Sequence, residues 1–521
     1  FFFNQKTEYE IRLSLVGSEM CIRDRLYICK NLFALSKVNL CHAFEQSLKL
    51  QKLRKLMALS QVKSQFKGSI GADLSLSIAA DFTNQNQPFL IVFESKEIAA
   101  FHLNDLELLL PKEAVLFYPG SYRRPYEIEQ TDDNNVLLRS EVLNRINSQR
   151  KSSVIVTYHE ALFEKVLSKK DLNKNTLKIS VGDILGLDFV NNVLFEYEFK
   201  RVDFVTEPGE FSIRGGIIDV FSFANDTPYR IEFFGDEVES IRTFDIVSQL
   251  SLKPYTKLQI IPNIEHKLKH EKRVGFLDYI PQNTVVWTQN LPALFQTTKV
   301  LFEKAKSAYK LLSESILYSD PEGLFCNSDN FKQSLLKFSI FELGSEKFYD
   351  TDSKKTVEVN VSPQPAFNKQ FKLLIDDLNQ KKASGFENYI CCANAKQAQR
   401  FHDIFEEHES VVHYKTLVFS LHQGFVNHDL KITCYTDHEI FERYHKFKLK
   451  NGFAKKQAIK LRELNSLEVG DYVTHIDHGI GKFGGLKKID IEGKSQEAIK
   501  LFYGDRDILY LSIHSLHKIT K

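Results

Sequence analysis

The spacing of apolar residues changes twice along this chain, and these changes decide which folds are open to it. Continuous apolar runs at residues 88–95 and 152–163 lead into helical spacing, which is typical of buried parallel strands followed by helices. Between about residues 175 and 263 the runs become short and alternating, with glycine turns between them, before the strand-and-helix pattern returns. The sequence therefore predicts a β-rich module inserted into an α/β domain.

A chain of 521 residues is too long for a single hydrophobic core, so we expect a multidomain protein of α/β and β structure. Helical spacing at 371–380 and 395–408, around a strand at 387–394, predicts a smaller α/β domain. Short strands and glycine turns from residue 467 onward predict a small β-barrel. The expected division is a non-native or disordered segment at 1–30, the first part of the large α/β domain at 31–175, the β-rich module at 176–262, the second part of the large α/β domain at 263–350, the smaller α/β domain at 356–441, a basic linker or helix at 442–465, and the barrel at 466–521.

The first 30 residues do not fit the pattern that follows them. Residue 1 is a phenylalanine, and the stretch "SLVGSEMCIRDR" at 14–25 resembles a translated sequencing-library adapter. A signal peptide is the alternative, but Glu19 and the charges at 23–25 would interrupt its apolar core. We therefore expect residues 1–30 to contribute nothing to function.

The overall charge of the chain does not name a partner. Lys and Arg number 69 against 67 Asp and Glu, a net charge of +2, so a nucleic-acid contact would need a local patch. The lysine-rich segment 443–465 is such a patch and predicts a weak contact with DNA, although a solvated linker or connecting helix explains it as well. No apolar run is long enough to cross a bilayer, and no C-x-x-C pair occurs, which favours a reduced, cytoplasmic protein without structural zinc. We expect it to be a monomer.

One segment sits where a phosphate-binding loop would be, before a helix. Such loops read G-x-x-x-x-G-K-[ST], because backbone N–H groups cradle the phosphate and the lysine neutralises it. The nearest match is "GSIGADLS" at 68–75, in which Asp73 and Leu74 replace the required glycine and lysine. An aspartate there would repel phosphate, so we expect no nucleotide, no cofactor and no catalytic residue in this chain. The residues of this degenerate loop are Gly68, Gly71, Asp73, Leu74 and Ser75.

The histidines offer one group with the residue types of a metal site, in "THIDHGIG" at 474–481. Strand alternation places His475 and Asp477 on one face and His478 near a glycine turn, which favours a turn or packing role over a metal. No nucleophile-elbow pattern occurs either. These observations favour a binding protein over an enzyme.

The β-rich module carries polar and aromatic residues on a strand face that would otherwise meet water. In "PYRIEFFGDEVESIR" at 228–242, a period of two places Ile231 and Phe233 on one face and Arg230 and Phe234 on the other. The Gly-Asp pair at 235–236 predicts the hairpin turn that fixes this register. Arginine beside phenylalanine on an open sheet face is the composition of a protein-binding hot spot. A solvated arginine beside a surface aromatic is the alternative.

Arg214 belongs to the same surface on similar grounds. It comes directly before the glycine pair 215–216, a bend or bulge that would turn its side chain outward. With these residues in view, "GEFSIRGGIIDVFSF" and "PYRIEFFGDEVESIRTFD" resemble the UvrA-binding module shared by UvrB and the transcription-repair coupling factors. In that family outward arginines and a phenylalanine dock on UvrA. The resemblance implies this role for Arg214, Arg230 and Phe234.

The C-terminal residues separate these two families. "VGDYVTHIDHGIGKF" and "YLSIHSLHKI", within residues 467–519, resemble the CarD-type RNA-polymerase-interacting domain, which coupling factors have and UvrB lacks. That domain binds the polymerase β subunit by pairing strand edges, a mode in which backbone hydrogen bonds give affinity. Ile489 is the foremost candidate contact, although an isoleucine in a strand is also a candidate for barrel core. The contact strand implied by the resemblance contains Leu486, Lys487, Lys488, Ile489 and Ile491.

The resemblance extends over residues 40–521 and is strongest in these two modules. It implies that the large α/β domain is a motor fold without its ATP site, and that the chain is the N-terminal portion of a longer protein. It also implies an adaptor that holds stalled RNA polymerase and recruits UvrA. The ATP and Mg of the family's DNA translocase would belong to a later segment, as would the domain that covers the UvrA face. The alternatives are an ATPase or helicase in its own right, and a stand-alone CarD-like transcription regulator.

Overall fold

The computed structural model of the chain describes residues 37–443 and 469–520, apart from short internal gaps. The gaps are at 86, 122–125, 127–132, 149–150, 224, 226, 247, 263–271, 312–318, 351–352, 409–410, 476–477, 492–493, 505–506 and 513–518. The segment predicted to be non-native, 1–30, lies outside the described residues, and so does the basic segment from residue 444 onward.

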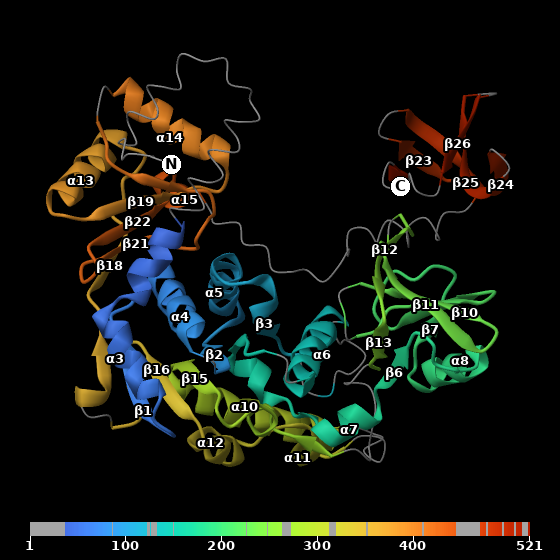
Figure 1. Cartoon of the computed structure of the whole chain (residues 1–521), viewed down its shortest axis with the longest axis horizontal. Helices are drawn as coiled ribbons and strands as arrows, with labels where there is room; N and C mark the ends of the chain where they lie inside the picture. The colour runs from blue at the N-terminus through green and yellow to red at the C-terminus, as the bar shows by residue number, and fades with distance from the viewer. Residues whose placement is uncertain are drawn as a thin grey trace, which may run out of the picture.

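A parallel sheet of seven strands forms the centre of the large α/β domain (Figure 1). The apolar runs predicted to be buried strands form β2 and β4, in which every residue is buried, because helices cover both faces of the sheet. The strand order is β17-β1-β16-β15-β2-β4-β3. The strands are β1 (Lys63–Lys67), β2 (Phe89–Phe93), β3 (Val115–Tyr118), β4 (Val154–Tyr158), β15 (Val285–Gln289), β16 (Ser339–Leu343) and β17 (Thr356–Glu358).

Helices lie on the two faces of this sheet. Figure 1 shows α10 and α12 on one side and α4, α5 and α6 on the other. The start of α5 follows from its sequence, since the Ser95 side chain accepts a hydrogen bond from the Ile98 N–H and caps the helix. Trp287, which is fully buried, packs edge-on against Phe66 at the centre of the core. The helices are α3 (Leu48–Met57), α4 (Ala72–Asn84), α5 (Lys96–Leu109), α6 (Asp133–Ser148), α10 (Leu291–Leu311) and α12 (Ser328–Leu336).

The β-rich module is inserted between β4 and β15, as the change of hydrophobic period predicts. Its two ends meet, because β6 (Leu177–Ser180) pairs antiparallel with β13 (Lys257–Ile260). Between them lies a sheet of six strands in the order β12-β11-β10-β9-β8-β7, with helix α8 (Leu187–Glu196). Its strands are β7 (Lys200–Arg201), β8 (Glu210–Arg214), β9 (Ile217–Val220), β10 (Tyr229–Phe234), β11 (Glu237–Phe244) and β12 (Ser251–Tyr255).

The smaller α/β domain contains the predicted strand between two helices, here α13 (Phe371–Ala383), β19 (Glu387–Cys391) and α14 (Ala395–Glu407). Its five-stranded sheet has the order β18-β21-β22-β19-β20. β17, from residue 356, pairs with β1 in the large sheet, so the predicted start of this domain falls inside that sheet. The other strands are β18 (Val361–Pro363), β20 (Lys415–Leu417), β21 (Phe425–Asn427) and β22 (Ile432–Thr436).

The C-terminal module is an antiparallel sheet in the order β26-β25-β24-β23-β27. Val473, Phe483, Ile499 and Leu501 are buried together at its core. Among the strands that the structure describes, β26 and β27 do not pair with each other, so closure into a barrel is not among the observed pairings. The strands are β23 (Tyr472–His475), β24 (Gly479–Ile491), β25 (Lys494–Tyr503), β26 (Asp507–Ser512) and β27 (Ile519–Thr520).

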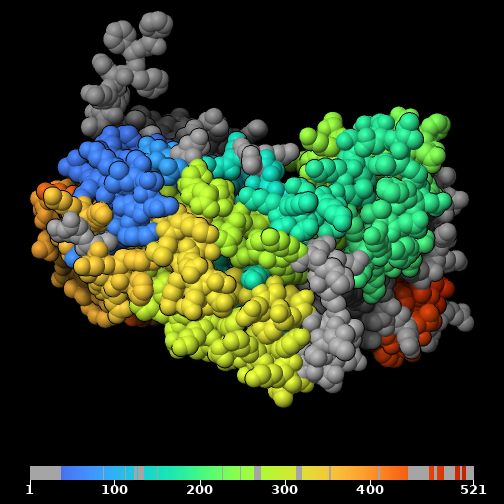
Figure 2. Space-filling view, turned by 90° about the horizontal axis from the view of Figure 1, so that it is seen from below, coloured from blue at the N-terminus to red at the C-terminus, as the bar shows by residue number. Residues whose placement is uncertain are grey.

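The β-rich module and the smaller α/β domain lie at opposite ends of the large α/β domain (Figures 1 and 2). In the described parts of the chain, no helix is both long enough and apolar enough to span a membrane. The remaining short elements are β5 (Val166–Leu167), α7 (Lys169–Lys174), β14 (Arg273–Val274), α9 (Phe276–Tyr279), α11 (Pro321–Leu324) and α15 (Asp437–Ile440).

Candidate functional site

The six-stranded sheet of the β-rich module has one buried face and a second face, called the open face here, that is exposed near the turn at 235–236. On β10 the burial alternates residue by residue, with Ile231 and Phe233 buried and Arg230 and Phe234 on the opposite face. This alternation confirms the face assignment made from the sequence. The Gly-Asp pair at 235–236 forms the hairpin turn between β10 and β11, and Gly235 adopts a φ of 62°, a left-handed conformation that favours glycine.

Phe234 is the most exposed aromatic group of this face, with 80% of its surface accessible. It is directly opposite Glu237 across the β10–β11 hairpin. The large buried phenylalanines of the core leave water on folding, whereas Phe234 stays in contact with it. Its position at the end of a hydrogen-bonded hairpin fixes the backbone from which the ring projects.

Arg230 lies on the same face but is held in place by the module itself. Its Nε donates to Asp219 Oδ1 at 2.8 Å and its Nη2 to Asp219 Oδ2 at 2.9 Å, a two-pronged ion pair. Its Nη1 donates to the carbonyl of Gln249, and the guanidinium lies 4.7 Å from the centre of the Phe244 ring. The hydrogen bonds to Asp219 raise the pKa of Arg230. With 16% of its side chain exposed, Arg230 is largely covered, and its guanidinium is fixed by the ion pair with Asp219.

Arg214 approaches the same carboxylate from the neighbouring hairpin. Its Nη2 pairs with Asp219 Oδ2, and 41% of its side chain is exposed, so it is the more accessible of the two arginines. The glycine pair 215–216 follows it directly and forms the predicted turn. Position 216 has no room for a side chain, because a Cβ on Gly216 would lie 2.8 Å from the Phe233 carbonyl oxygen. The arginine therefore stands at the tip of β8, beside the end of β10.

Asp219, which is 1% exposed, is the residue that the sequence reasoning missed. It is directly opposite Arg230 in the β9–β10 pairing and opposite Ser212 in the β8–β9 pairing. Because directly paired residues place their side chains on the same face, the β9–β10 register alone would have found it. A buried carboxylate between two arginines orients both, so their side chains have little rotational freedom left to lose.

The strand implied to contact RNA polymerase is the second half of β24. Residues 486–491 pair with β25 on one side, from Leu486 opposite Ile499 to Ile491 opposite Lys494. β23 pairs only with residues 479–482 of β24. Among the strands that the structure describes, nothing pairs with the other edge of 486–491. The side chains of these residues lie outside the described part of the structure, so the choice of Ile489 remains a prediction.

The degenerate phosphate loop precedes α4, as predicted, and the smaller α/β domain covers it. The Ala72 N–H at the start of the helix donates to the carbonyl of Gln423 at 3.2 Å. Gly71, with a φ of 58°, is so close to Gln423 that an added side chain would lie 3.1 Å from it. Gly68 leaves no space either, because a side chain there would overlap the Val359 carbonyl oxygen at 2.0 Å. The backbone at residues 359 and 423 therefore packs directly against this loop and the start of α4.

Asp73 is completely buried in this contact. Its carboxylate accepts hydrogen bonds from Ser69 Oγ at 2.6 Å and from Asn427 Nδ2 at 2.8 Å. Burial raises the pKa of Asp73 to about 6. Leu74 is partly buried, and the buried Ser75 shares a hydrogen bond with His102. Asp73 is therefore part of the contact between the large and the smaller α/β domains.

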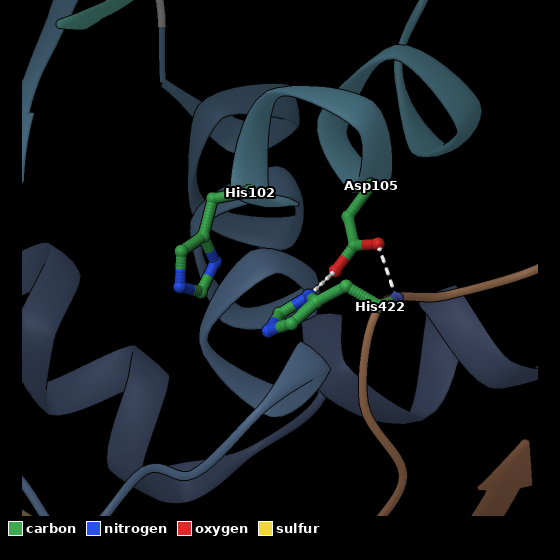
Figure 3. A group of neighbouring side chains, drawn as sticks. All are labelled: His102, Asp105 and His422. Atoms are coloured by element: carbon green, nitrogen blue, oxygen red, sulfur yellow. Dashed lines mark hydrogen bonds and ion pairs between the residues drawn. The ribbon is translucent and has the colours of Figure 1, made fainter. Parts of the chain in front are cut away.

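A cluster of three side chains, His102, Asp105 and His422, lies next to this contact (Figure 3). Their ligand atoms are within 4.8 Å of one another. Both carboxylate oxygens of Asp105 already accept hydrogen bonds from His422, one from its backbone N–H at 2.9 Å and one from its ring Nδ1 at 2.5 Å (Figure 3). Nδ1 of His102 is shared with Ser75 at 2.8 Å, and burial lowers the pKa of His102 well below its usual value. The cluster therefore fastens the loop at 421–424 to α5, and its geometry does not require a metal.

The two remaining sequence predictions lie outside the described structure. Of the candidate metal group, Asp477 and the His475 side chain are not described, and His478 is exposed, with its ring 6.4 Å from that of Tyr503. The lysine-rich segment is described only at Arg443, which stacks on Phe441 at 4.5 Å. Contact with DNA by this segment stays a prediction.

Comparison with known proteins matches both modules to family models. Residues 177–266 match the UvrB interaction domain, and residues 467–521 match the CarD-like/TRCF RID domain. The chain is 24% identical to the transcription-repair-coupling factor of Bacillus subtilis and 24% identical to that of Haemophilus influenzae, in each case over 87% of this chain. It is 25% identical to that of Rickettsia typhi over 84% of this chain.

The chain is similar to transcription-repair-coupling factors. This finding confirms the resemblance drawn from the sequence motifs. The aligned region covers 44% of each of these relatives, so the chain spans less than half of their length. The open face with Arg214, Arg230 and Phe234 lies within the match to the UvrB interaction domain, and β24 lies within the match to the CarD-like domain.

Proposed function

We propose that this chain is an adaptor of transcription-coupled nucleotide-excision repair, which binds stalled RNA polymerase through residues 466–521 and recruits UvrA through the β-rich module. The observation that supports it most is the open sheet face inside the UvrB interaction domain, where Asp219 fixes two arginines beside an exposed Phe234. Arginine and aromatic residues are the usual hot spots of protein interfaces. We further propose that the adaptor works as a monomer in the bacterial cytoplasm.

The physical design of the face favours a protein partner. Burying the Phe234 ring in a partner removes apolar surface from water, which is the main driving force of association. The arginines are already ordered by Asp219, so binding does not have to restrict them further. A solvated arginine beside a stray aromatic would not need a buried carboxylate to hold it.

For RNA polymerase we propose β-strand addition to β24. The edge of residues 486–491 has backbone groups that no described strand pairs with, and such an edge accepts an extended strand from a partner. The contact residues are Leu486, Lys487, Lys488, Ile489 and Ile491, with Ile489 foremost. Closure of the C-terminal sheet into a small barrel belongs to the same proposal.

The strand-addition step can be tested with two neighbouring proline variants. In an antiparallel strand, the N–H groups of successive residues point to opposite edges. Of Lys488→Pro and Ile489→Pro, one therefore removes an N–H that faces β25 and the other removes one that faces the open edge. We expect the open-edge variant to keep its fold and lose polymerase binding. Unchanged binding by a folded open-edge variant would contradict strand addition.

We also propose that the chain hydrolyses no ATP and needs no cofactor. The support is the covered N-terminus of α4, where Gln423 and Asn427 occupy the place of a phosphate and Leu74 stands where the lysine belongs. A steady-state ATPase assay, with and without DNA, tests this. Turnover above background would favour the alternative of an ATPase in its own right.

The experiment that tests the adaptor function is a calorimetric titration of the full chain with UvrA. Phe234→Ala removes an exposed ring and should weaken binding by about 2 kcal/mol or more, as for a hot-spot residue. Arg230→Ala should weaken it similarly. Arg400→Ala is the matched control, because Arg400 also stacks on a phenylalanine, Phe441 at 4.5 Å, but lies in the smaller α/β domain. Polymerase binding without UvrA binding would favour a CarD-like transcription regulator.

A further inference from the structure

A row of three exposed residues crosses the open face next to the hairpin turn at 235–236. Phe234 on β10 is directly opposite Glu237 on β11. On its other side, Glu237 is directly opposite Ile184, which forms an isolated antiparallel bridge with it. Because paired residues in adjacent strands place their side chains on the same face, Phe234, Glu237 and Ile184 stand in one line across the sheet.

Backbone hydrogen bonds hold Ile184 in this row. The N–H of Leu185 donates to the Asp236 carbonyl at 2.8 Å, and the N–H of Val238 donates to the Asp183 carbonyl at 3.0 Å. These two bonds flank the Ile184–Glu237 pair, which is therefore a narrow, non-hydrogen-bonded pair in which the side chains approach most closely. The segment before α8 thus joins the tip of the sheet through an isolated β-bridge.

Ile184 is as exposed as Phe234, at 82% against 80% of their surfaces. A single exposed apolar residue is ordinary on a protein surface. Two large apolar residues on one rigid row, with a carboxylate between them, form a patch of defined shape and charge. The patch is continuous with the face proposed to bind UvrA, because Phe234 belongs to both.

We propose that Ile184 is a second apolar anchor for UvrA, and that Glu237 pairs with a basic side chain of UvrA between the two anchors. The inference rests on the proposed function, since it names further contacts of the same face. The partner surface that fits this row has two apolar depressions separated by a lysine or arginine. Arg214 and Arg230 would then meet acidic groups of the same partner farther along the sheet.

Titration of UvrA into the full chain tests this inference with four variants. Ile184→Ala should weaken binding about tenfold, and Ile184→Asp about a hundredfold, because a carboxylate cannot enter an apolar depression. Leu48→Ala is the matched control: Leu48 is 80% exposed on α3, in the large α/β domain, and its loss should leave the affinity unchanged. Glu237→Gln should reduce the dependence of the affinity on salt.

The outcomes separate this inference from the adaptor function itself. If Phe234→Ala weakens binding while both Ile184 variants keep the affinity of the parent chain, the second anchor is wrong and the adaptor function stands. If the folded parent chain does not bind UvrA at all, both are wrong. Thermal unfolding of each variant checks the fold. Ile184→Ala should unfold at the temperature of the parent because the side chain is exposed, whereas Ile184→Asp, which places a carboxylate opposite Glu237, should unfold slightly below it.

Discussion

Two regions of this molecule, one beside the smaller α/β domain and one in the β-rich module, differ in how far their side chains are exposed to water (Figures 1 and 2). At the N-terminus of α4, Ala72 and Asp73 are buried and bonded to Gln423 and Asn427 of the smaller α/β domain. In the six-stranded sheet, by contrast, Phe234 remains exposed, with 80% of its surface accessible. The comparison teaches that one surface is covered from within the chain, whereas the other leaves a large apolar ring in water, as the proposed contact with UvrA requires.

Two phenylalanine truncations, one in each region, should show the largest difference between the regions in the free energy of unfolding. Phe425→Ala, in the covered region, removes a fully buried ring that packs against Phe44 with ring centres 6.1 Å apart. We expect it to lower the free energy of unfolding by about 3–5 kcal/mol, because it leaves a cavity. Phe234→Ala should change it by less than about 0.5 kcal/mol, since that ring is in water already. Urea unfolding of both variants measures the difference, and equal losses would refute it.

A second carboxylate placed against Asp73 should have the next largest effect. Asn427→Asp replaces the amide that donates to Asp73 at 2.8 Å by an acid, so two carboxyl groups face each other without solvent. We expect a loss of about 2–4 kcal/mol at pH 7.5, because one group must stay protonated or unpaired. Asn394→Asp is the control: Asn394 caps α14 at an exposed position, where aspartate is an equally good cap. Similar losses in both variants would show that the contact carries no special cost.

The protonation of Asp73 gives a pH-dependent prediction. Burial raises its pKa from 3.8 to about 6, so the folded chain holds this proton more tightly than the unfolded chain. The stabilisation is complete below about pH 4 and is lost as the pH rises to about 6. Asp73→Asn cannot lose a proton and still accepts from Asn427. We expect it to be more stable than the parent by about 1–3 kcal/mol at pH 7.5.

Chemical unfolding of parent and variant across pH 4–8 measures this gain. The difference between the two should grow between about pH 4 and 6 and then stay constant. A constant difference over the whole range would mean that Asp73 is ionised throughout. That result would also weaken the account of α4 as a closed, water-free contact.

The smallest effect is expected for an ion pair on the open face. Arg242 pairs with Glu232 in the middle of the sheet, with 36% and 28% of their side chains exposed. Glu232→Gln should cost only about 0.2–1 kcal/mol of stability, because partly exposed pairs are screened by water. Urea unfolding measures this loss. A loss above about 2 kcal/mol would show that the Arg242–Glu232 pair contributes as much as a buried pair, and the two regions would then differ less than proposed.

The sequence predicted the elements whose hydrophobic period is clear. The buried strand β2 and the helix α14 follow directly from a continuous apolar run and from helical spacing. The alternation of β10 also placed Arg230 and Phe234 on the correct face. These features depend on neighbours within a few residues, which a single sequence contains.

Most of the contacts between distant segments in the two regions could not be predicted from the sequence. Gln423 covers α4 through its backbone carbonyl, which leaves no mark in the residue type. Ile184 joins the open face through a bridge to Glu237, more than fifty residues later, in a segment with no strand pattern of its own. Asp219 was within reach, because the register of β9 and β10 places it opposite Arg230.

The strand order of the large sheet has a consequence for how the chain is made. β1 lies between β16 and β17, and Val62 and Ser339, at the starts of β1 and β16, are 277 positions apart. At about 5–20 residues per second, β1 leaves the ribosome roughly 15–55 seconds before either neighbouring strand exists. The β-rich module, closed at its ends by β6 and β13, is synthesised entirely within that interval. All residues of the surface proposed for UvrA are therefore synthesised before β15, β16 and β17 of the large sheet, which carries the module.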